Sequence, residues 1–303
     1  MLLFSDRRRA VLLVCGLLLG ATVLPARTSY AAGPPQIPVL LRPSDARAGE
    51  VSGPGYFAVS ADPGATVQLY AFVANKGRVR AGIDLVPVDA TSGVYGAISY
   101  NLPEQRRTRV GAWVHLSRRW VQLGSNRGTV VAFSLHIPHR INPGQYIGAL
   151  TAFVPAPALE AHRGVGIRLQ TRVFNAIVVT VPGPTHASFT ILGVTPQLES
   201  NELYVMVHVR NSGNVLLKGQ GYLWVYAPWS KKPWIYTRIS LDTTVPHTTV
   251  HYPIHWAKRV PRARYRFAVR ISWQGGTSSS AGVQNLVRWT AGTSQLRGFF
   301  WVH

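Results

Sequence analysis

The chain has 303 residues, 47% of them hydrophobic, which is enough for two domains that each bury a core. Its 32 lysines and arginines against 11 acidic residues give a net charge of +21, which favours anionic partners, with an acidic habitat as the alternative explanation. The single cysteine, Cys15, excludes an intrachain disulfide and any cysteine-based metal or redox site.

Residues 1–31 have the features of a secretory signal peptide. Arg7 to Arg9 form a basic region, Val11 to Leu24 an apolar stretch, and Ser29-Tyr30-Ala31 a small-x-small cleavage site. The apolar stretch is shorter than the roughly 20 residues of a transmembrane helix. We therefore expect an exported protein with no transmembrane helix in the mature chain, and retention of this segment as an anchor is the alternative. Export makes nucleic acid a poor candidate partner.

Residues 32–55 are rich in proline and glycine and predict an extended lead-in. Residues 56–183 then show short alternating segments separated by turn residues, which predicts a first β-domain. The expected strands are Tyr56 to Ser60, Thr66 to Ala74, Ala81 to Val88, Val110 to Leu116, Trp120 to Leu123, and those between residues 130 and 154 and between 164 and 181. Gly93 to Leu102 is either a further strand or an elaborated loop.

The clearest β signal lies between Val130 and Val154. From Val131 to Ile137 every second residue is large and apolar, the period of a half-buried strand, and Pro138 ends the run. Asn142-Pro143-Gly144 supplies turn residues, and a second strand starts near Tyr146. We expect the two strands to pair as a hairpin at the centre of the first domain.

The second half again shows short alternating segments separated by turn residues. The composition of Val181-Pro182-Gly183-Pro184 marks the boundary between the two domains. We expect a second β-domain over residues 184–291 and a C-terminal tail over 292–303. Its expected strands are Phe189 to Val194, Leu203 to Val209, Gly221 to Tyr226, Trp234 to Ile239, Thr248 to Trp256, Tyr265 to Trp273 and a closing strand from Gln284 to Trp289.

Both halves contain an alternating strand that ends in Asn-x-Gly, at Asn75 to Gly77 and at Asn211 to Gly213. About seven short strands per half, with turn signals between them, predict an all-β protein of two tandem immunoglobulin-like β-sandwiches.

A pattern of structural positions covers roughly residues 55 to 183 and consists of Trp120-Val121-Gln122-Leu123, the strand from Val131 to Pro138, Pro143-Gly144-Gln145-Tyr146-Ile147-Gly148, and Ile167 to Gly183. In these positions the first half resembles the first immunoglobulin-like domain of WxL-interacting proteins. This resemblance implies a surface protein of Gram-positive-type bacteria, with a first domain that binds peptidoglycan and a second that binds other surface or host proteins. Family members end in a transmembrane helix and basic tail, whereas residues 298–303 are too short to span.

No pattern indicates catalysis or a cofactor. The carboxylates fall mostly beside turns, and there is no nucleophile elbow or phosphate-binding glycine loop. His247, His251 and His255 are the sharpest metal candidate. On a strand each step of four residues spans about 13 Å, too far for one metal ion. We therefore expect a non-enzymatic protein with no metal and no cofactor.

The binding candidates are tryptophans and cations. A predicted hairpin loop carries Trp229, Lys231, Lys232 and Trp234, a combination that suits a glycan or teichoic polymer. The alternative is that one tryptophan closes the end of the sandwich and the lysines are only solvated. The polar faces of two predicted strands carry further cations: Arg264, Arg266 and Arg270 on one, Arg168 and Arg172 on the other.

These observations predict an exported cell-surface protein that binds an anionic wall polymer of the peptidoglycan or teichoic type, another surface protein, or both. The alternative is a periplasmic pilus-type chaperone, which binds its subunits by strand donation and holds their terminal carboxylate with basic cleft residues.

Overall fold

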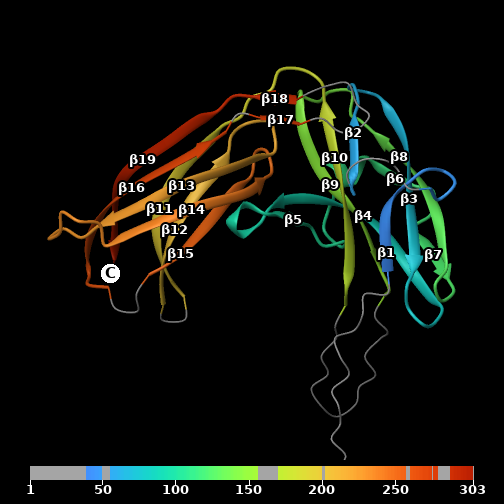
Figure 1. Ribbon diagram of the computed structural model, residues 1–303, viewed down its shortest axis with the longest axis horizontal. Coiled ribbons are helices and arrows are strands. Elements are labelled where there is room, and N and C mark those ends of the chain that lie inside the picture. The colour runs from blue at the N-terminus through green and yellow to red at the C-terminus, as the bar shows by residue number, and fades with distance from the viewer. Residues whose placement is uncertain are drawn as a thin grey trace, which may run out of the picture. The chain divides into compact units, whose positions relative to one another are not determined.

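The computed structural model describes residues 39–49, 55–155, 170–199, 202–256, 260–274, 276–278 and 287–302. The described chain is almost entirely β-structure, which confirms the predicted all-β fold (Figure 1). The predicted signal peptide and Arg168 lie outside the described residues. No helix in the described part is long and apolar enough to cross a bilayer.

The first sandwich has two sheets. One has the order β1 (Val39–Ser44), β3 (Thr66–Asn75), β8 (Gly128–His136), β6 (Val114–Leu116). The other has the order β2 (Phe57–Ser60), β10 (Arg172–Val181), β9 (Gly144–Phe153), β4 (Ala81–Ser92), β5 (Ile98–Tyr100), with β7 (Trp120–Leu123) also on β4. A 3₁₀ turn, η1 (Val94–Gly96), and a short helix, α1 (Val110–Trp113), lie between strands. Side chains from both sheets, such as Phe133 and Ile177, form one core.

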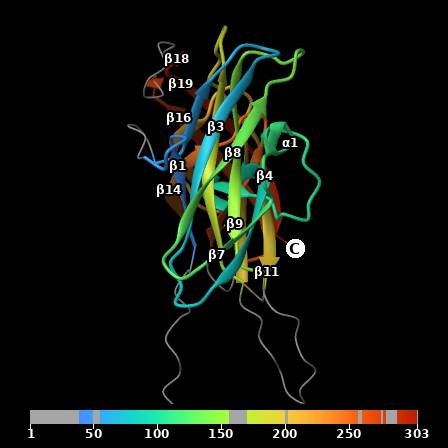
Figure 2. The same ribbon diagram turned by 90° about the vertical axis from the view of Figure 1, so that its right-hand side faces the viewer.

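The expected hairpin between residues 130 and 154 is wrong in its pairing. Both strands exist, but β8 pairs with β3 and β6, whereas β9 pairs with β10 and β4 in the other sheet. Figure 2 shows β3 beside β8. The residues between the strands include Pro138 and Pro143, which cannot donate a ladder hydrogen bond, so the chain crosses between sheets here. Alternation identifies a strand but not its partner.

The second sandwich packs β11 (Phe189–Glu199), β12 (Glu202–Asn211) and β15 (Thr249–His255) against a four-stranded sheet. That sheet has the order β14 (Ile235–Thr244), β13 (Leu217–Tyr226), β16 (Ala263–Trp273), β19 (Gly292–Val302). A separate pair, β17 (Gly276–Ser278) and β18 (Val287–Trp289), completes the strands. A second core includes Leu223, Ile239 and Tyr265.

Three boundaries of the sequence prediction need correction. The lead-in contains strand β1, which pairs with β3. Of the expected closing strand, the structure describes residues 287–289, which form β18 and pair with β17. The expected tail 292–303 contains β19, which pairs with β16. Gly292 and Gly298 of β19 leave room for the rings of Trp273 and Phe267, so the inward positions of its first half are not uniformly apolar in sequence.

The two Asn-x-Gly turns have the same internal chemistry. Asn211 is fully buried, donates through Nδ2 to the carbonyl oxygens of Val215 (2.9 Å) and Thr244 (3.0 Å), and accepts from the Gly213 amide (3.1 Å). Asn75, also fully buried, makes the equivalent bonds in the first sandwich, including one from the Gly77 amide at 2.8 Å. Each asparagine closes a turn by satisfying buried backbone groups.

Direct hydrogen bonds connect the two sandwiches. The amide of Gln145 donates to the carbonyl oxygen of Asn214 at 2.7 Å, and the Gln145 side chain accepts from the Leu216 amide at 2.9 Å. Ser92 Oγ accepts from the Val245 amide at 2.8 Å. A small apolar cluster that includes Ile147 lies beside these bonds.

Candidate functional site

The four-stranded sheet of the second sandwich turns one side to solvent. Along its strands the inward residues are buried in the core and the alternate residues are exposed or half-buried. We call these outward residues the arginine–aromatic face: Gln220, Tyr222, Trp224 and Tyr226 on β13; Tyr236, Arg238 and Ser240 on β14; Arg264, Arg266, Arg270 and Ser272 on β16; Gln295, Arg297, Phe299 and Trp301 on β19.

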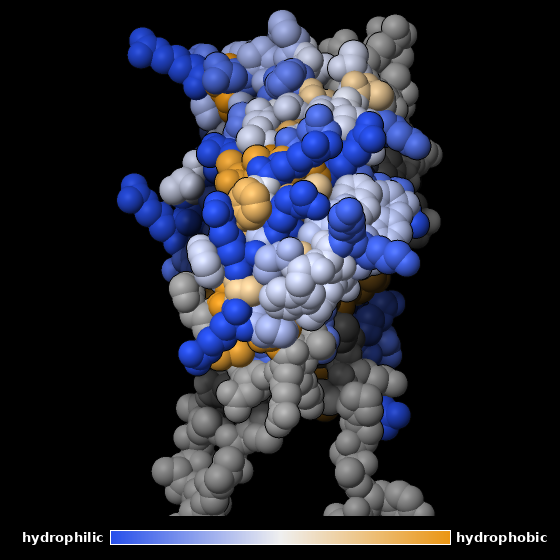
Figure 3. Space-filling model, turned by 90° about the vertical axis from the view of Figure 1, so that its left-hand side faces the viewer, coloured by the Kyte–Doolittle hydropathy of each residue, from blue (hydrophilic) through white to orange (hydrophobic). Residues whose placement is uncertain are grey.

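Figure 3 views the molecule from the side on which β16 and β19 lie in Figure 1. Strongly hydrophilic side chains stand there among side chains of intermediate hydropathy and small apolar patches. This mixture distinguishes the surface from an ordinary solvated sheet face, where polar side chains dominate.

Three rings on β13 and β14 form a platform on the face. Tyr222 and Trp224 both stack on Tyr236, with ring centroids 5.4 and 5.7 Å apart and planes within 16° and 24° of parallel. Tyr236 is 61% exposed and Tyr222 40% exposed. Large rings open to water at this level offer a flat surface on which a planar or sugar ring can stack.

The arginines of the face lie beside rings or in a hollow. The guanidinium of Arg266 lies 4.7 Å from the ring centre of Tyr226, and that of Arg264 lies 4.2 Å from the ring centre of Phe299. Stacking uses the flat face of a guanidinium and leaves its in-plane N–H groups for other acceptors. Arg238 donates to the side chain of Gln220.

The positive charge of the face is not balanced within it. The only carboxylate in the four strands is Asp242, at the end of β14. Its Oδ1 lies 2.9 Å from Lys218 Nζ, and the hydrogen bond from Lys218 is the main cause that lowers the pKa of Asp242. Because Asp242 is already paired with a lysine, the five arginines present a net cationic surface.

A hollow of about 540 Å³ lies beside the aromatic platform. In register, Ala268 stands between Trp224 and Arg297, so its small side chain leaves space between larger ones. Arg266 and Arg270 line the same hollow. Three guanidinium groups and an indole therefore surround one depression.

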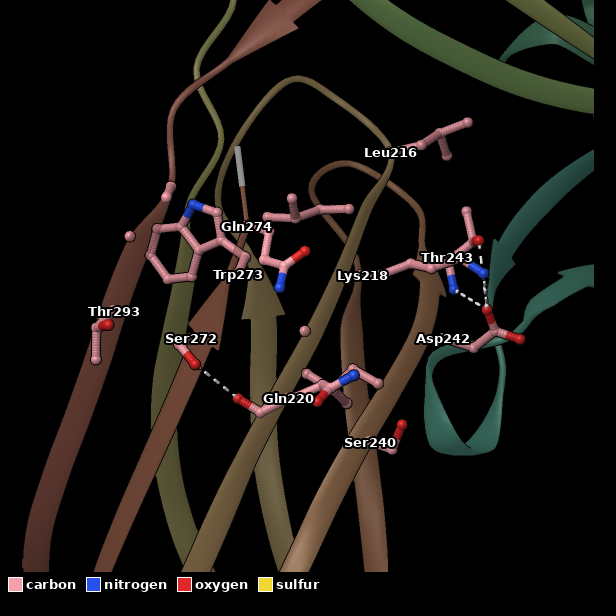
Figure 4. A pocket seen from close by; sticks show the side chains of 15 residues that line it. Leu216, Lys218, Gln220, Ser240, Asp242, Thr243, Ser272, Trp273, Gln274 and Thr293 are labelled. Atoms are coloured by element: carbon pink, nitrogen blue, oxygen red, sulfur yellow. Dashed lines mark hydrogen bonds and ion pairs between the residues drawn. The ribbon is translucent and has the colours of Figure 1, made fainter. Parts of the chain in front are cut away.

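A wider hollow of about 1160 Å³ continues along the same strands (Figure 4). Its lining includes Gln220, Ser240 and Ser272, one row beyond Tyr222 and Arg270. The Ser272 hydroxyl donates to the Gln220 carbonyl oxygen at 3.2 Å, drawn as a dashed line in Figure 4. Hydroxyl and amide groups here suit the hydroxyls of a neutral ring more than a second anion.

The structure brings three of the predicted binding residues together, because Arg264, Arg266 and Arg270 all lie on the arginine–aromatic face. It does not place Arg172 in an open patch. Arg172 donates to Glu104 at 3.3 Å, donates to Gln170 and lies over the ring of Phe153, so its charge is engaged within the first sandwich.

The predicted tryptophan loop contacts the end of the second core. Trp229 and Trp234 form an edge-to-face pair with centroids 5.4 Å apart, and both rings lie 6.2 Å from the buried ring of Tyr265. The pair therefore contacts the end of the core through Tyr265 and also keeps ring surface open to solvent, with Trp229 57% and Trp234 43% exposed. Lys231 and Lys232 are exposed in the same loop.

The predicted histidine series does not converge. His255 Nε2 lies 3.2 Å from Glu202 Oε2, whereas His251 contacts His208 on β12. His247 stands in the turn before β15 with a φ of 61°. Among the residues that the structure describes, no group of three or more histidine, cysteine, aspartate or glutamate side chains is placed to hold a metal ion.

Sequence reasoning missed the rings and cations contributed by β13, β14 and β19. Tyr222, Trp224 and Tyr226 follow the same period of two that identified the arginines of β16. Arg297 lies in the segment predicted as a tail. The alternation signal was present in β13, but recognition of the face required the strand order.

A third, smaller cleft of about 290 Å³ lies where the two sandwiches meet. Arg109, Arg140 and Trp113 line it from the first sandwich and His247 from the second. Burial is the main cause that lowers the pKa of His247, and the charge of Arg109 lowers it further. The cleft is therefore cationic through its arginines.

No protein-family model matches the chain, and no curated protein matches it by sequence. Its fold is similar to that of a chain from the chaperone–tip adhesin complex of CFA/I fimbriae (8% identity, 86% of this chain and 98% of that chain covered, TM-score 0.36). It is also similar to the class 5 fimbriae chaperone CfaA (9%, 77% and 94%, 0.34) and to a chain of the CsuC–CsuE complex from Csu pili of Acinetobacter baumannii (12%, 66% and 87%, 0.33). Likenesses this distant assign neither a family nor a function.

Proposed function

We propose that this chain is an exported, non-enzymatic cell-surface protein whose arginine–aromatic face binds an anionic, ring-bearing wall polymer of the peptidoglycan or teichoic type. One observation carries the proposal: five arginines and a stacked aromatic platform share one solvent-facing sheet surface that contains no unpaired carboxylate. On the resemblance to WxL-interacting proteins, the first sandwich would add contacts to peptidoglycan, and another surface protein would be a further partner.

The two parts of the face suit the two parts of such a polymer. Guanidinium groups bind carboxylate and phosphate oxygens through paired N–H donors, and the hollow beside Trp224 holds three of these groups. The platform of Tyr222, Trp224 and Tyr236 offers stacking surfaces for rings between the anions. Binding through many exposed cations predicts an affinity that falls steeply as salt rises.

Sedimentation with purified bacterial cell wall tests the proposal. The mature protein is mixed with intact wall and with wall stripped of its anionic polymer, at low and at high salt. We expect sedimentation with intact wall at low salt, and strong reduction by high salt or by stripping. Failure to sediment with intact wall at low salt would exclude wall-polymer binding.

A charge-matched pair of variants locates the site. The triple variant Arg266→Ser, Arg270→Ser, Arg297→Ser removes three charges from the face. The control Arg78→Ser, Arg80→Ser, Arg127→Ser removes three exposed charges from turns of the first sandwich. Only the first should strongly reduce sedimentation; equal losses in both would show that net charge, and not the face, is responsible.

A second candidate function is that of a pilus-type chaperone. The observation that favours it is the cationic cleft between the sandwiches, lined by Arg109 and Arg140, which suits a terminal carboxylate. A partner subunit that co-purifies with the wild type should then be lost in Arg109→Ser, Arg140→Ser and kept in the triple variant of the arginine–aromatic face. The reverse pattern would contradict this function.

A further inference from the structure

Two histidines face each other on the solvent side of the three-stranded sheet, away from the arginine–aromatic face. His208 of β12 and His251 of β15 are direct partners in the strand register. Their Nδ1 atoms lie 2.6 Å apart, and their ring centroids are 4.8 Å apart at an interplanar angle of 74°. The two Nδ1 atoms therefore point at each other, at the distance of a hydrogen bond between the rings.

The ring of His208 is held in this orientation by a third side chain. Thr195 of β11 places its Oγ1 2.8 Å from His208 Nε2. When Nε2 carries the proton and donates it to Thr195, the Nδ1 lone pair of His208 faces His251. A hydrogen bond of this kind to the distal nitrogen is how proteins orient a metal-binding imidazole.

We propose that His208 and His251 bind one Cu(II) ion through their Nδ1 atoms, with water completing the coordination. Two imidazole nitrogens at about 2.0 Å from one ion are about 2.8 Å apart at the 90° angle of tetragonal geometry and about 3.3 Å apart at a tetrahedral angle. The separation of 2.6 Å is that of a hydrogen bond between the two rings, so an ion would replace the shared proton once the rings turn toward it and the nitrogens separate by about 0.2 Å.

The choice of Cu(II) follows from ligand type and geometry. Imidazole suits zinc, nickel and copper, tetragonal nitrogen and oxygen sites are typical of Cu(II), and Cu(II) binds most strongly in the divalent series. Burial, together with the charge of His251, lowers the pKa of His208, which keeps its imidazole neutral and able to bind a metal at neutral pH.

Electron paramagnetic resonance and calorimetric titration with copper sulfate, in a glycine buffer that suppresses weak sites, test the assignment. The mature wild-type protein should bind one equivalent of Cu(II) and show hyperfine splitting from nitrogen ligands. His208→Asn and His251→Asn should each weaken binding at least tenfold. His255→Asn is the matched control, because His255 lies on the same strand and the same side, four residues further on.

The variants also separate copper binding from loss of fold, because both histidines are surface residues and circular dichroism should be unchanged. Cu(II) affinity and spectrum in folded His251→Asn equal to those of the wild type would overturn the proposal. An equal loss of affinity in His255→Asn would overturn it as well, because the ion would then not be specific for the cross-strand pair.

Discussion

Replacement of Asn211 by alanine tests how the second sandwich closes its turn after β12. The side chain is fully buried and makes three hydrogen bonds, all to backbone groups: two donated by Nδ2 and one accepted by Oδ1. Alanine removes all three and leaves the Val215 and Thr244 carbonyls and the Gly213 amide without this partner.

The magnitude follows from these bonds. Each buried hydrogen bond contributes about 1 kcal/mol net, and a buried group left unpaired costs about 1–3 kcal/mol. Three lost bonds, with partial rescue by water in the vacated space, give a loss of about 3–5 kcal/mol. That is a large share of the roughly 5–15 kcal/mol typical of a folded domain.

The assay is urea unfolding followed by tryptophan fluorescence, with the free energy of unfolding extrapolated to water. The midpoint should fall with little change in slope. Asn75→Ala should cost the first sandwich a similar amount, because it breaks equivalent bonds. Asn142→Ala, at an exposed asparagine that uses its backbone oxygen to accept from Tyr146, should change stability by less than about 0.5 kcal/mol. A loss below about 1 kcal/mol in Asn211→Ala would refute the reasoning.

Three further outcomes are expected. Gly221→Ala should prevent folding of the second sandwich or lower its thermal midpoint sharply, because the new Cβ would meet the Arg270 carbonyl oxygen, and an unchanged midpoint would contradict the strand register. The pKa of His208 is lowered in the folded state, so the unfolded chain binds more protons, and the free energy of unfolding should fall as pH falls from about 6.5 through the lowered pKa. His208→Asn should reduce that decrease, and an identical pH profile would exclude His208 as its source. Trp224→Ala should weaken polymer binding without changing its salt dependence, because it removes stacking surface and no charge; unchanged affinity would place the rings of the ligand elsewhere.

Turns and strand alternation could be predicted from the sequence, because they depend on residues that are close together in the chain. The Asn-x-Gly turns at Asn75 and Asn211 and the alternation in β8 and β16 needed only nearby residues. Pairing was not readable, because β8 and β9 are consecutive strands that belong to opposite sheets. The alternation in the sequence shows which side chains of a strand point inward and which point outward. Which strands pair with one another depends on long-range packing in the core, which alternation does not encode.

The same limit explains what was found of the site. Arg264, Arg266 and Arg270 share one strand, so their common side follows from a period of two. Their neighbours across the sheet, such as Arg297, depend on strand order and register. The pair of His208 and His251, 43 residues apart in sequence, is likewise a product of register and leaves no signal in either strand alone.

The most direct test of the central claim is the dissociation constant for a soluble anionic wall polymer, measured at several salt concentrations for the wild type and the two triple arginine variants. We predict that the triple variant Arg266→Ser, Arg270→Ser, Arg297→Ser loses about 3 kcal/mol of binding free energy, at about 1 kcal/mol per exposed cation. This corresponds to an affinity that is lower by roughly a hundredfold. Its salt dependence should also be shallower, while Arg78→Ser, Arg80→Ser, Arg127→Ser stays close to the wild type. Equal affinity and equal salt dependence in all three proteins would contradict the account.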